Sequence, residues 1–228
     1  MGKQKIHGVK HRNELNVVQK IIMWLFLVFF GVIMFLPLWN VLVVSTTTSL
    51  EASRSGVQLW WHEFSIEGFE YVFRVSKLAR PFLNSLFVTT LGTVIQVGLS
   101  SIAGYVLIQR DLPFKGVLTS FILLTMMIPG DLTMISIYQL NVSLKLINTY
   151  TGLILNGLIS GFSILLMRNY FESISFTLAE SARIDGASEM RIFAGIFLPI
   201  SLPGLATVFF MEYVGRWNSI TIPAAILT

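Results

Sequence analysis

The stretch AESARIDGASEMRIFAGIFLPIS, residues 179–201, has a charged first half and an apolar second half. Although long apolar runs lie on both sides of it, its first half carries five charged residues: Glu180, Arg183, Asp185, Glu189 and Arg191. Gly186 accepts a backbone conformation that other residues resist, so the chain can reverse there. Ser188 is a suitable N-cap for a following helix. The pattern predicts a short helix–turn–helix between two apolar segments.

The composition indicates a membrane protein. Hydrophobic residues fill 54% of the 228 positions and charged residues only 12%. Soluble domains carry about 25% charged residues, and an apolar helix needs roughly 17–25 residues to cross a bilayer. Several runs of this chain reach that length. We therefore expect an all-α protein, a polytopic bundle of transmembrane helices.

Five apolar runs are expected to span the membrane: 21–44, 82–109, 116–140, 150–171 and 196–216. The first is longer than the core of a cleaved signal peptide, which has about 7–15 residues, so it is expected to remain as a span. Pro129 and Gly130 interrupt the third. Close helix contacts are indicated in the second by three evenly spaced glycines, namely Gly92, Gly98 and Gly104.

The distribution of basic residues predicts the orientation of these spans. Lys and Arg are concentrated in residues 1–20 and recur in the short loop 110–115, as is typical of cytoplasmic segments. We therefore expect a cytoplasmic basic N-terminus at 1–20, followed by a transmembrane domain at 21–228. The long loop 45–81, with Trp60 and Trp61, would lie outside, and the charged loop 172–198 would lie in the cytoplasm.

The residue inventory argues against catalysis. The chain has no cysteine, and its three histidines, His7, His11 and His62, lie outside the apolar runs without metal-ligand spacing. Neither a disulfide framework nor a cysteine-based site can therefore form. No nucleophile–base set stands out within the spans. We expect no catalytic residue, no metal site and no cofactor bound by this chain.

The charged loop allows two interpretations. Amphipathic interfacial helices are common in membrane proteins, so the loop could be a solvated connection between two spans. It could also be a docking element for a cytoplasmic partner. The spacing of its residues decides between these interpretations.

The residues Glu180-Ser181-Ala182 are followed after three positions by Gly186 and after nine more by Ile196-Phe197-Leu198-Pro199. This pattern resembles the EAA loop of ABC-importer permeases, in which E-A-A, three residues, G, nine residues and I-x-L-P follow one another. Only Ser181 departs from it, one small residue replacing another. Further blocks, such as SIAGYVLIQRDLPFKG, MMIPGDLTMISIYQL and VGRWNS, are similar to those of the maltose-type carbohydrate permeases, in particular the oligosaccharide branch.

The resemblance covers roughly residues 20–228, and it departs from the family in one important way. Members of the family usually carry a sixth span and a cytoplasmic tail, which this sequence lacks. We therefore expect that the sequence is truncated or incomplete. Proline is also frequent in the family where Ser175 stands, which concerns only the beginning of the loop.

The resemblance implies a type I permease subunit of an ATP-driven importer in the bacterial plasma (inner) membrane, forming half of the translocation pathway. The implied partners are a second permease in a heterodimer, two ATPase subunits, an extracytoplasmic solute-binding protein and membrane lipid, but no nucleic acid. ATP and Mg would bind the ATPase subunits. The cargo would be an oligosaccharide or a related carbohydrate.

The resemblance also assigns roles within the loop. Glu180 would make a charge-assisted contact to a basic group of the ATPase. Close packing would come from Ser181 and Ala182, and the turn from Gly186. The loop would be joined to the fifth span by three residues: Ile196, Leu198 and Pro199.

Four polar residues within or near the spans are candidates for the translocation path: Asp131, Glu212, Arg216 and Asn218. Asp131 could equally cap a helix that restarts after Gly130. Glu212 and Arg216 are four residues apart and can pair on one helix face, although Arg216 could also snorkel to the surface. Trp217 could stack on a sugar or anchor the helix at the interface.

Two other classes of protein remain as alternatives. A self-sufficient secondary carrier or channel often shows internal repeats and discontinuous helices around a central site. This sequence shows one helix break and no convincing repeat, and a carrier leaves the loop spacing unexplained. A membrane enzyme is the third alternative, for which no residue set is found.

Overall fold

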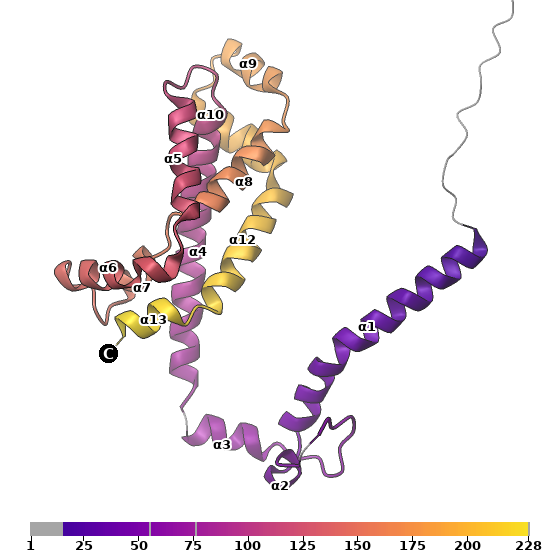
Figure 1. The fold of residues 1–228 in the computed structure, drawn as a ribbon. Coiled ribbons are helices and arrows are strands. Elements are labelled where there is room, and N and C mark those ends of the chain that lie inside the picture. The colour runs from indigo at the N-terminus through magenta and orange to yellow at the C-terminus, as the bar shows by residue number, and fades with distance from the viewer. Residues whose placement is uncertain (1–15, 55, 76, 228) are drawn as a thin grey trace, which may run out of the picture. The chain divides into compact units, whose positions relative to one another are not determined.

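The computed structural model describes residues 16–54, 56–75 and 77–227, so most of the predicted basic N-terminus lies outside the described residues. These residues are predominantly helical, and the described chain contains no strand beyond an isolated bridge between Thr47 and Phe64. The chain forms two compact units, Met1–Ala79 and Arg80–Thr228, whose helices are drawn in Figure 1.

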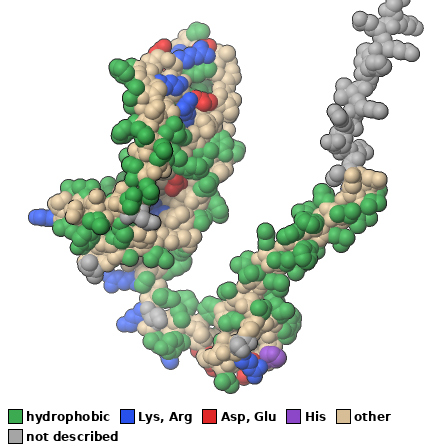
Figure 2. All heavy atoms as spheres, in the orientation of Figure 1, with side chains coloured by type: hydrophobic (Ala, Val, Ile, Leu, Met, Phe, Trp, Pro, Cys, Tyr) green, Lys and Arg blue, Asp and Glu red, His purple; other side chains and the backbone are tan. Residues whose placement is uncertain are grey.

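The first unit is built on the long helix α1 (Val17–Ser45). Asn16 and Gln19 form a capping box that satisfies free backbone groups at its start. Its 29 residues correspond to about 44 Å at 1.5 Å per residue, which is enough to cross a bilayer. Hydrophobic side chains cover α1 along its length (Figure 2), and Val43 is its only buried residue.

Two short helices follow α1, namely α2 (Ser49–Ala52) and α3 (Glu67–Val75). Between them the chain folds back onto the end of α1 through two tryptophans. The indole of Trp39 donates a hydrogen bond to the carbonyl of Leu59 over 2.8 Å, and the indole of Trp61 donates to Oγ1 of Thr46 over 2.7 Å. This arrangement gives the end of α1 a small aromatic cap.

The second unit is a helical bundle organised along α4 (Ala79–Ile108). Helices α5, α8 and α12 lie along α4, whereas α9 and α10 lie at one end of the bundle (Figure 1). The bounds are α5 (Lys115–Met127), α6 (Gly130–Ser143), α7 (Tyr150–Leu155), α8 (Gly161–Glu172), α9 (Phe176–Ile184), α10 (Glu189–Ile192), α11 (Leu198–Ile200), α12 (Leu202–Trp217) and α13 (Thr221–Ile226), with a π-helical turn at Phe193–Phe197.

The helices are less continuous than the sequence predicts. Within the described residues, only α1 and α4 are long and apolar enough to cross a membrane alone, and two bent pairs raise the number to at most four. The expected interruption at Pro129 bends α5 and α6 by 101°, and Glu189–Ile200 and Leu202–Trp217 meet at 79°. The predicted run 150–171 divides into α7 and α8, a break that the sequence analysis missed. The five-span topology therefore stays a prediction.

The core of the second unit lies directly beneath α9 and α10. Tyr105 of α4 packs at ring-centroid distances of 5.1 Å on both Phe193 and Phe197, and Phe171 of α8 packs at 5.9 Å on Phe197. Phe171 and Phe197 are fully buried. This aromatic cluster joins α4, α8 and the π-helical turn, and so fixes the segment that carries the charged stretch.

The three evenly spaced glycines of α4 have different surroundings. A Cβ atom at Gly104 would lie 2.8 Å from the backbone nitrogen of Arg168, so α4 and α8 touch there. A Cβ atom at Gly92 would lie 2.8 Å from Cζ of Arg216. At Gly98 nothing lies within 4 Å. The prediction of close contacts holds at Gly92 and Gly104 and is wrong at Gly98, which faces away from the other helices.

We expect Gly104→Ala to destabilise the bundle, because the added methyl meets backbone that cannot move independently. Overpacking of this kind costs about 1–3 kcal/mol. Gly98→Ala is the matched control on the same helix and is expected to be neutral or stabilising, by up to about 1 kcal/mol from helix propensity. Thermal unfolding of the purified chain, followed by circular dichroism, measures both. Equal melting temperatures would contradict the contact between α4 and α8.

Candidate functional site

The charged stretch forms the expected helix–turn–helix, which we call the charged element (residues 176–192). Helix α9 ends in a Schellman motif, in which the amide of Ala187 donates to the carbonyl of Ala182 over 2.9 Å and the amide of Gly186 donates to Arg183 over 3.0 Å. Gly186 has a φ of 79°, in the left-handed region that favours glycine. Helix α10 begins after Ser188, which occupies the predicted N-cap position, although its side chain makes no capping hydrogen bond.

Helix α9 has an inner and an outer face. Ala179 is fully buried and Ala182 packs against the aromatic core. Glu180 and Ser181 are exposed, and Ile184 is 87% exposed. The two small residues of the motif therefore differ in position, because Ser181 lies on the open face whereas Ala182 packs largely inside this chain.

The remaining residues of the motif connect the charged element to α12. Ile196 and Leu198 are half-buried against the same core, and Pro199 is exposed in α11. Phe197 between them is fully buried. These positions anchor the end of the π-helical turn, so the charged element cannot move freely with respect to α12.

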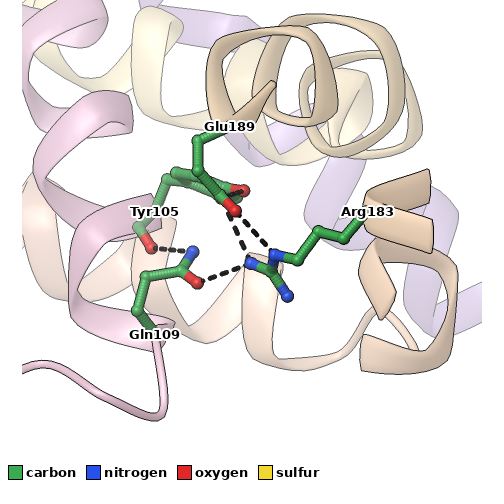
Figure 3. A network of polar contacts seen from close by, with 4 residues as sticks. All are labelled: Tyr105, Gln109, Arg183 and Glu189. Atoms are coloured by element: carbon green, nitrogen blue, oxygen red, sulfur yellow. Dashed lines mark hydrogen bonds and ion pairs between the residues drawn. The ribbon is translucent and has the colours of Figure 1, made fainter. Parts of the chain in front are cut away.

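A polar network binds the charged element to the end of α4 (Figure 3). Arg183 donates from Nε to Oε1 of Glu189 over 2.6 Å and from Nη2 to Oε1 of Gln109 over 2.9 Å. Tyr105 donates its hydroxyl proton to Oε2 of Glu189 over 2.7 Å. The hydrogen bond to Glu189 raises the pKa of Arg183 further above its usual value, so this guanidinium stays charged.

Glu180 already has a partner within the chain. Its Oε1 lies 2.8 Å from Nη1 of Arg110, and the guanidinium of Arg110 lies 4.4 Å from the ring centroid of Phe176. The side chains of Arg110 and Glu180 are 67% and 46% exposed. An exposed ion pair contributes only about 0–1 kcal/mol, so another cation can replace Arg110 at little cost.

Sequence reasoning missed the partners of the charged element. Arg110, Gln109 and Tyr105 lie 70 to 84 positions before the residues that they contact. The basic loop 110–115 was predicted on the same side of the membrane as the charged loop, which was the available signal. The exposed apolar residues Ile184 and Met190 were also missed. Figure 2 shows basic and acidic side chains gathered at this end of the bundle.

A second candidate site, the polar cavity, lies within the bundle. Its volume is about 800 Å³. It is formed by α4, α7, the break at 156–160, α12 and α13, and its polar lining consists of Asn84, Ser85, Thr89, Gln96, Asn148, Thr149, Asn156, Ser160, Glu212, Arg216 and Ser219. Trp217 and Tyr150 add aromatic surface.

The structure separates the four predicted path residues. Glu212 and Arg216 line the polar cavity. Asn218 instead caps the end of α12 and does not belong to the lining. Asp131 lies in the first turn of α6, and its side chain is outside what the structure describes.

Glu212 and Arg216 do not form the ion pair that their spacing allows. Glu212 instead accepts a hydrogen bond from the hydroxyl of Ser163 on α8. Arg216 reaches across to the break between α7 and α8, where its guanidinium donates to the carbonyls of Leu153 (3.4 Å), Asn156 (3.3 Å) and Gly157 (2.9 Å). It also donates to Oε1 of Gln96 on α4 over 3.1 Å.

The contacts of Arg216 explain how the chain tolerates this break. The last carbonyls of a helix have no partner within the helix, and away from water each needs another donor. The planar guanidinium supplies several donors in a fixed fork. The absence of a side chain at Gly92 leaves the room that the guanidinium occupies. Arg216 is therefore a brace that joins α12, α4 and the break.

We expect Arg216→Leu to destabilise the bundle by roughly 1–3 kcal/mol or more, because buried carbonyls would lose their donors. Arg216→Lys should be intermediate, since one ammonium cannot reproduce the fork. Arg191→Leu, an exposed position on α10, is the control and should change little. Thermal unfolding of the purified chain measures the three variants. A stability of Arg216→Leu equal to that of the control would contradict the brace.

Comparisons with known proteins agree with this arrangement. The family described as "Binding-protein-dependent transport system inner membrane component" matches residues 96–228. The polygalacturonan/rhamnogalacturonan transport system permease protein YtcP of Bacillus subtilis is 35% identical over 194 residues, covering 85% of this chain and 67% of its own length. The arabinooligosaccharides transport system permease protein AraQ of Halalkalibacterium halodurans is 30% identical over 213 residues, covering 91% and 76%.

One solved structure confirms the fold. A chain of a bacterial ABC transporter involved in the import of the acidic polysaccharide alginate superposes with a TM-score of 0.83 at 24% identity. The likeness covers 96% of this chain and 78% of the other. This likeness and the family match together confirm the predicted all-α transmembrane bundle of the permease type.

Proposed function

This chain belongs to the family of binding-protein-dependent transport system inner membrane components, and we propose that it forms half of an oligosaccharide pathway which an ATPase drives through the charged element. It is a permease subunit of an ABC importer and not an enzyme. The prediction of an ABC-importer permease is confirmed, and the alternative of a self-sufficient carrier is not supported.

The substrate class is supported by the names of relatives and by the lining of the polar cavity. Two similar permeases are named for the transport of polygalacturonan/rhamnogalacturonan and of arabinooligosaccharides. Amide and hydroxyl groups, which both donate and accept hydrogen bonds, dominate the polar lining here. Trp217 offers an aromatic face on which an apolar sugar face can stack. Such a surface suits a polyhydroxylated ligand, and we assign Glu212 and Arg216 to its wall.

The proposed coupling to an ATPase rests on one observation: Glu180 is exposed on α9, a helix that is held to α4. Its carboxylate is half exposed beside an exchangeable partner, Arg110. A basic group of an ATPase can therefore take the place of Arg110. Ser181, the strongly exposed Ile184 and the exposed Met190 would add packing around this charge. We assign Gly186 to the turn that presents this surface.

Motion of the charged element would pass to the spans through two connections. The first is the network of Arg183 and Glu189 with Tyr105 and Gln109 of α4. The second is the aromatic core, against which Ile196 and Leu198 pack, leading through Pro199 and α11 to α12. Rigid helices joined in this way rotate as bodies rather than deform, which is how alternating access is produced.

The proposed assembly contains a second, similar permease, two ATPase subunits and an extracytoplasmic solute-binding protein. ATP and Mg would be held by the ATPase subunits, where hydrolysis supplies the driving force. The chain would lie in the bacterial plasma (inner) membrane with its N-terminus in the cytoplasm. The charged element would then face the ATPase.

We expect Glu180→Gln to reduce sugar uptake strongly, because the charged contact to the ATPase is lost. Arg110→Gln removes the same intramolecular ion pair but leaves the carboxylate, so it should transport nearly normally. Glu172→Gln, which breaks the exposed pair with Arg168, is the second control. Uptake and ATP hydrolysis are measured in vesicles that contain the co-expressed subunits. Equal effects of Glu180→Gln and Arg110→Gln would show that Glu180 serves only the internal pair.

The proposed orientation is testable because the chain contains no cysteine. Ser53 and Ser188 are both exposed and lie in loops predicted on opposite sides of the membrane. A membrane-impermeant maleimide added to intact cells should label Ser53→Cys and leave Ser188→Cys unlabelled until the cells are opened. The reverse labelling pattern would exclude a cytoplasmic ATPase as the partner of the charged element.

A further inference from the structure

Helix α3 is strongly amphipathic, and the two aromatic side chains of its apolar face are exposed in the described chain, whereas Val72 is partly buried. Phe69, Val72 and Phe73 follow one another at helical spacing and form one face, whereas three charged residues, Glu67, Glu70 and Arg74, form the opposite face. None of its residues is buried. Phe69 is 46% exposed and Phe73 is 63% exposed.

The position of α3 is fixed by the end of α1. A Cβ atom at Gly68 would lie 3.9 Å from the carbonyl oxygen of Ser45, the last residue of α1. The amide of Ser65 donates to the carbonyl of Thr46 over 3.0 Å, and Oγ1 of Thr47 donates to the carbonyl of Glu63 over 2.8 Å. The start of α3 therefore lies at the end of a helix long enough to span the membrane.

The short connection between α3 and α4 limits where the other end of α3 can lie. Residues 76–78 separate α3 from α4, which is the second helix that can cross a membrane alone. At about 3.3–3.6 Å per residue, four steps along the chain reach at most about 14 Å. A helix tied at both ends to membrane-spanning helices cannot leave the membrane surface.

The side chains near α3 are of the kinds that are found at a membrane surface. Trp39, Trp60 and Trp61 form an aromatic cluster at the end of α1, with ring centroids 5.4 to 6.5 Å apart, and tryptophan is enriched where a membrane meets water. Three basic residues, Arg74, Lys77 and Arg80, lie in or just after α3, where lipid phosphates would meet them. A protein that docked only transiently would leave Phe69 and Phe73 in water between encounters, whereas lipid covers them continuously.

We propose that α3 is an interfacial helix that lies on the membrane surface, with Phe69, Val72 and Phe73 inserted between lipid chains and Glu67, Glu70 and Arg74 in water. It anchors the connection between α1 and α4 to the bilayer. Amphipathic helices of this kind bury their apolar face about 5–10 Å into the boundary between headgroups and acyl chains. The proposal holds whichever side of the membrane carries α3.

Single cysteines test this assignment in the otherwise cysteine-free chain. Phe69→Cys and Phe73→Cys probe the apolar face, and Glu67→Cys is the matched control, because residues two positions apart on a helix lie on nearly opposite sides. Each full-length variant is labelled in detergent with an environment-sensitive nitrobenzoxadiazole maleimide. It is then reconstituted with its co-purifying subunits into nanodiscs of phosphatidylcholine and phosphatidylglycerol. Quenching by a doxyl group on a lipid acyl chain is compared with quenching by aqueous iodide.

We expect the lipid-borne quencher to act several-fold more strongly at positions 69 and 73 than at position 67, and iodide to show the opposite order. Equal lipid quenching at positions 67 and 69 would overturn the proposal. So would probes at 69 and 73 that iodide reaches until a solute-binding protein or another subunit is added. That second outcome would identify α3 as a protein-docking surface instead.

Discussion

Backbone polar groups that lie away from water must find partners inside the protein, and this constraint decides how the bundle tolerates its break between α7 and α8. The long helices α1 and α4 satisfy it internally. The break between α7 and α8 does not, and it persists because Arg216 donates to three of its carbonyls. Asn156 supports the same region by donating to the carbonyl of Gly152 over 2.6 Å and to Oδ1 of Asn141 over 3.1 Å.

Polar groups also find partners within the protein at the charged end of the bundle. Tyr105 packs its ring among Phe171, Phe193 and Phe197 while its hydroxyl reaches Glu189. One residue thus belongs both to the apolar core and to the polar network. A displacement of α9 or α10 relative to α4 would have to break both sets of contacts together. The charged element is for this reason part of the bundle and not a loose loop upon it.

The sequence was sufficient for the class, the family and the helix–turn–helix, since these depend on composition, spacing and local turn chemistry. Gly186 could be assigned to a turn because a left-handed residue after a helix favours glycine. The partners of charged residues could not be predicted, because they depend on which helix faces meet. Glu212 and Arg216 satisfied the rule for a pair on one helix, yet Ser163 and the carbonyls of the break competed successfully for them. The break itself has no proline, but the dipeptide Asn156-Gly157, which is typical of turns and in which Gly157 has a φ of 84°, was an available signal that the sequence analysis did not use.

The fit of Arg216 against Gly92 has a consequence for sequence variation. The guanidinium fills the space that any side chain at position 92 would need, and its length is required to reach the break. A larger residue at 92 would therefore displace the guanidinium from the carbonyls of the break, and these carbonyls would then need another donor. Single changes at either position are disfavoured although double changes need not be. Such mutual dependence would slow the divergence of both sites and make them change in the same lineages.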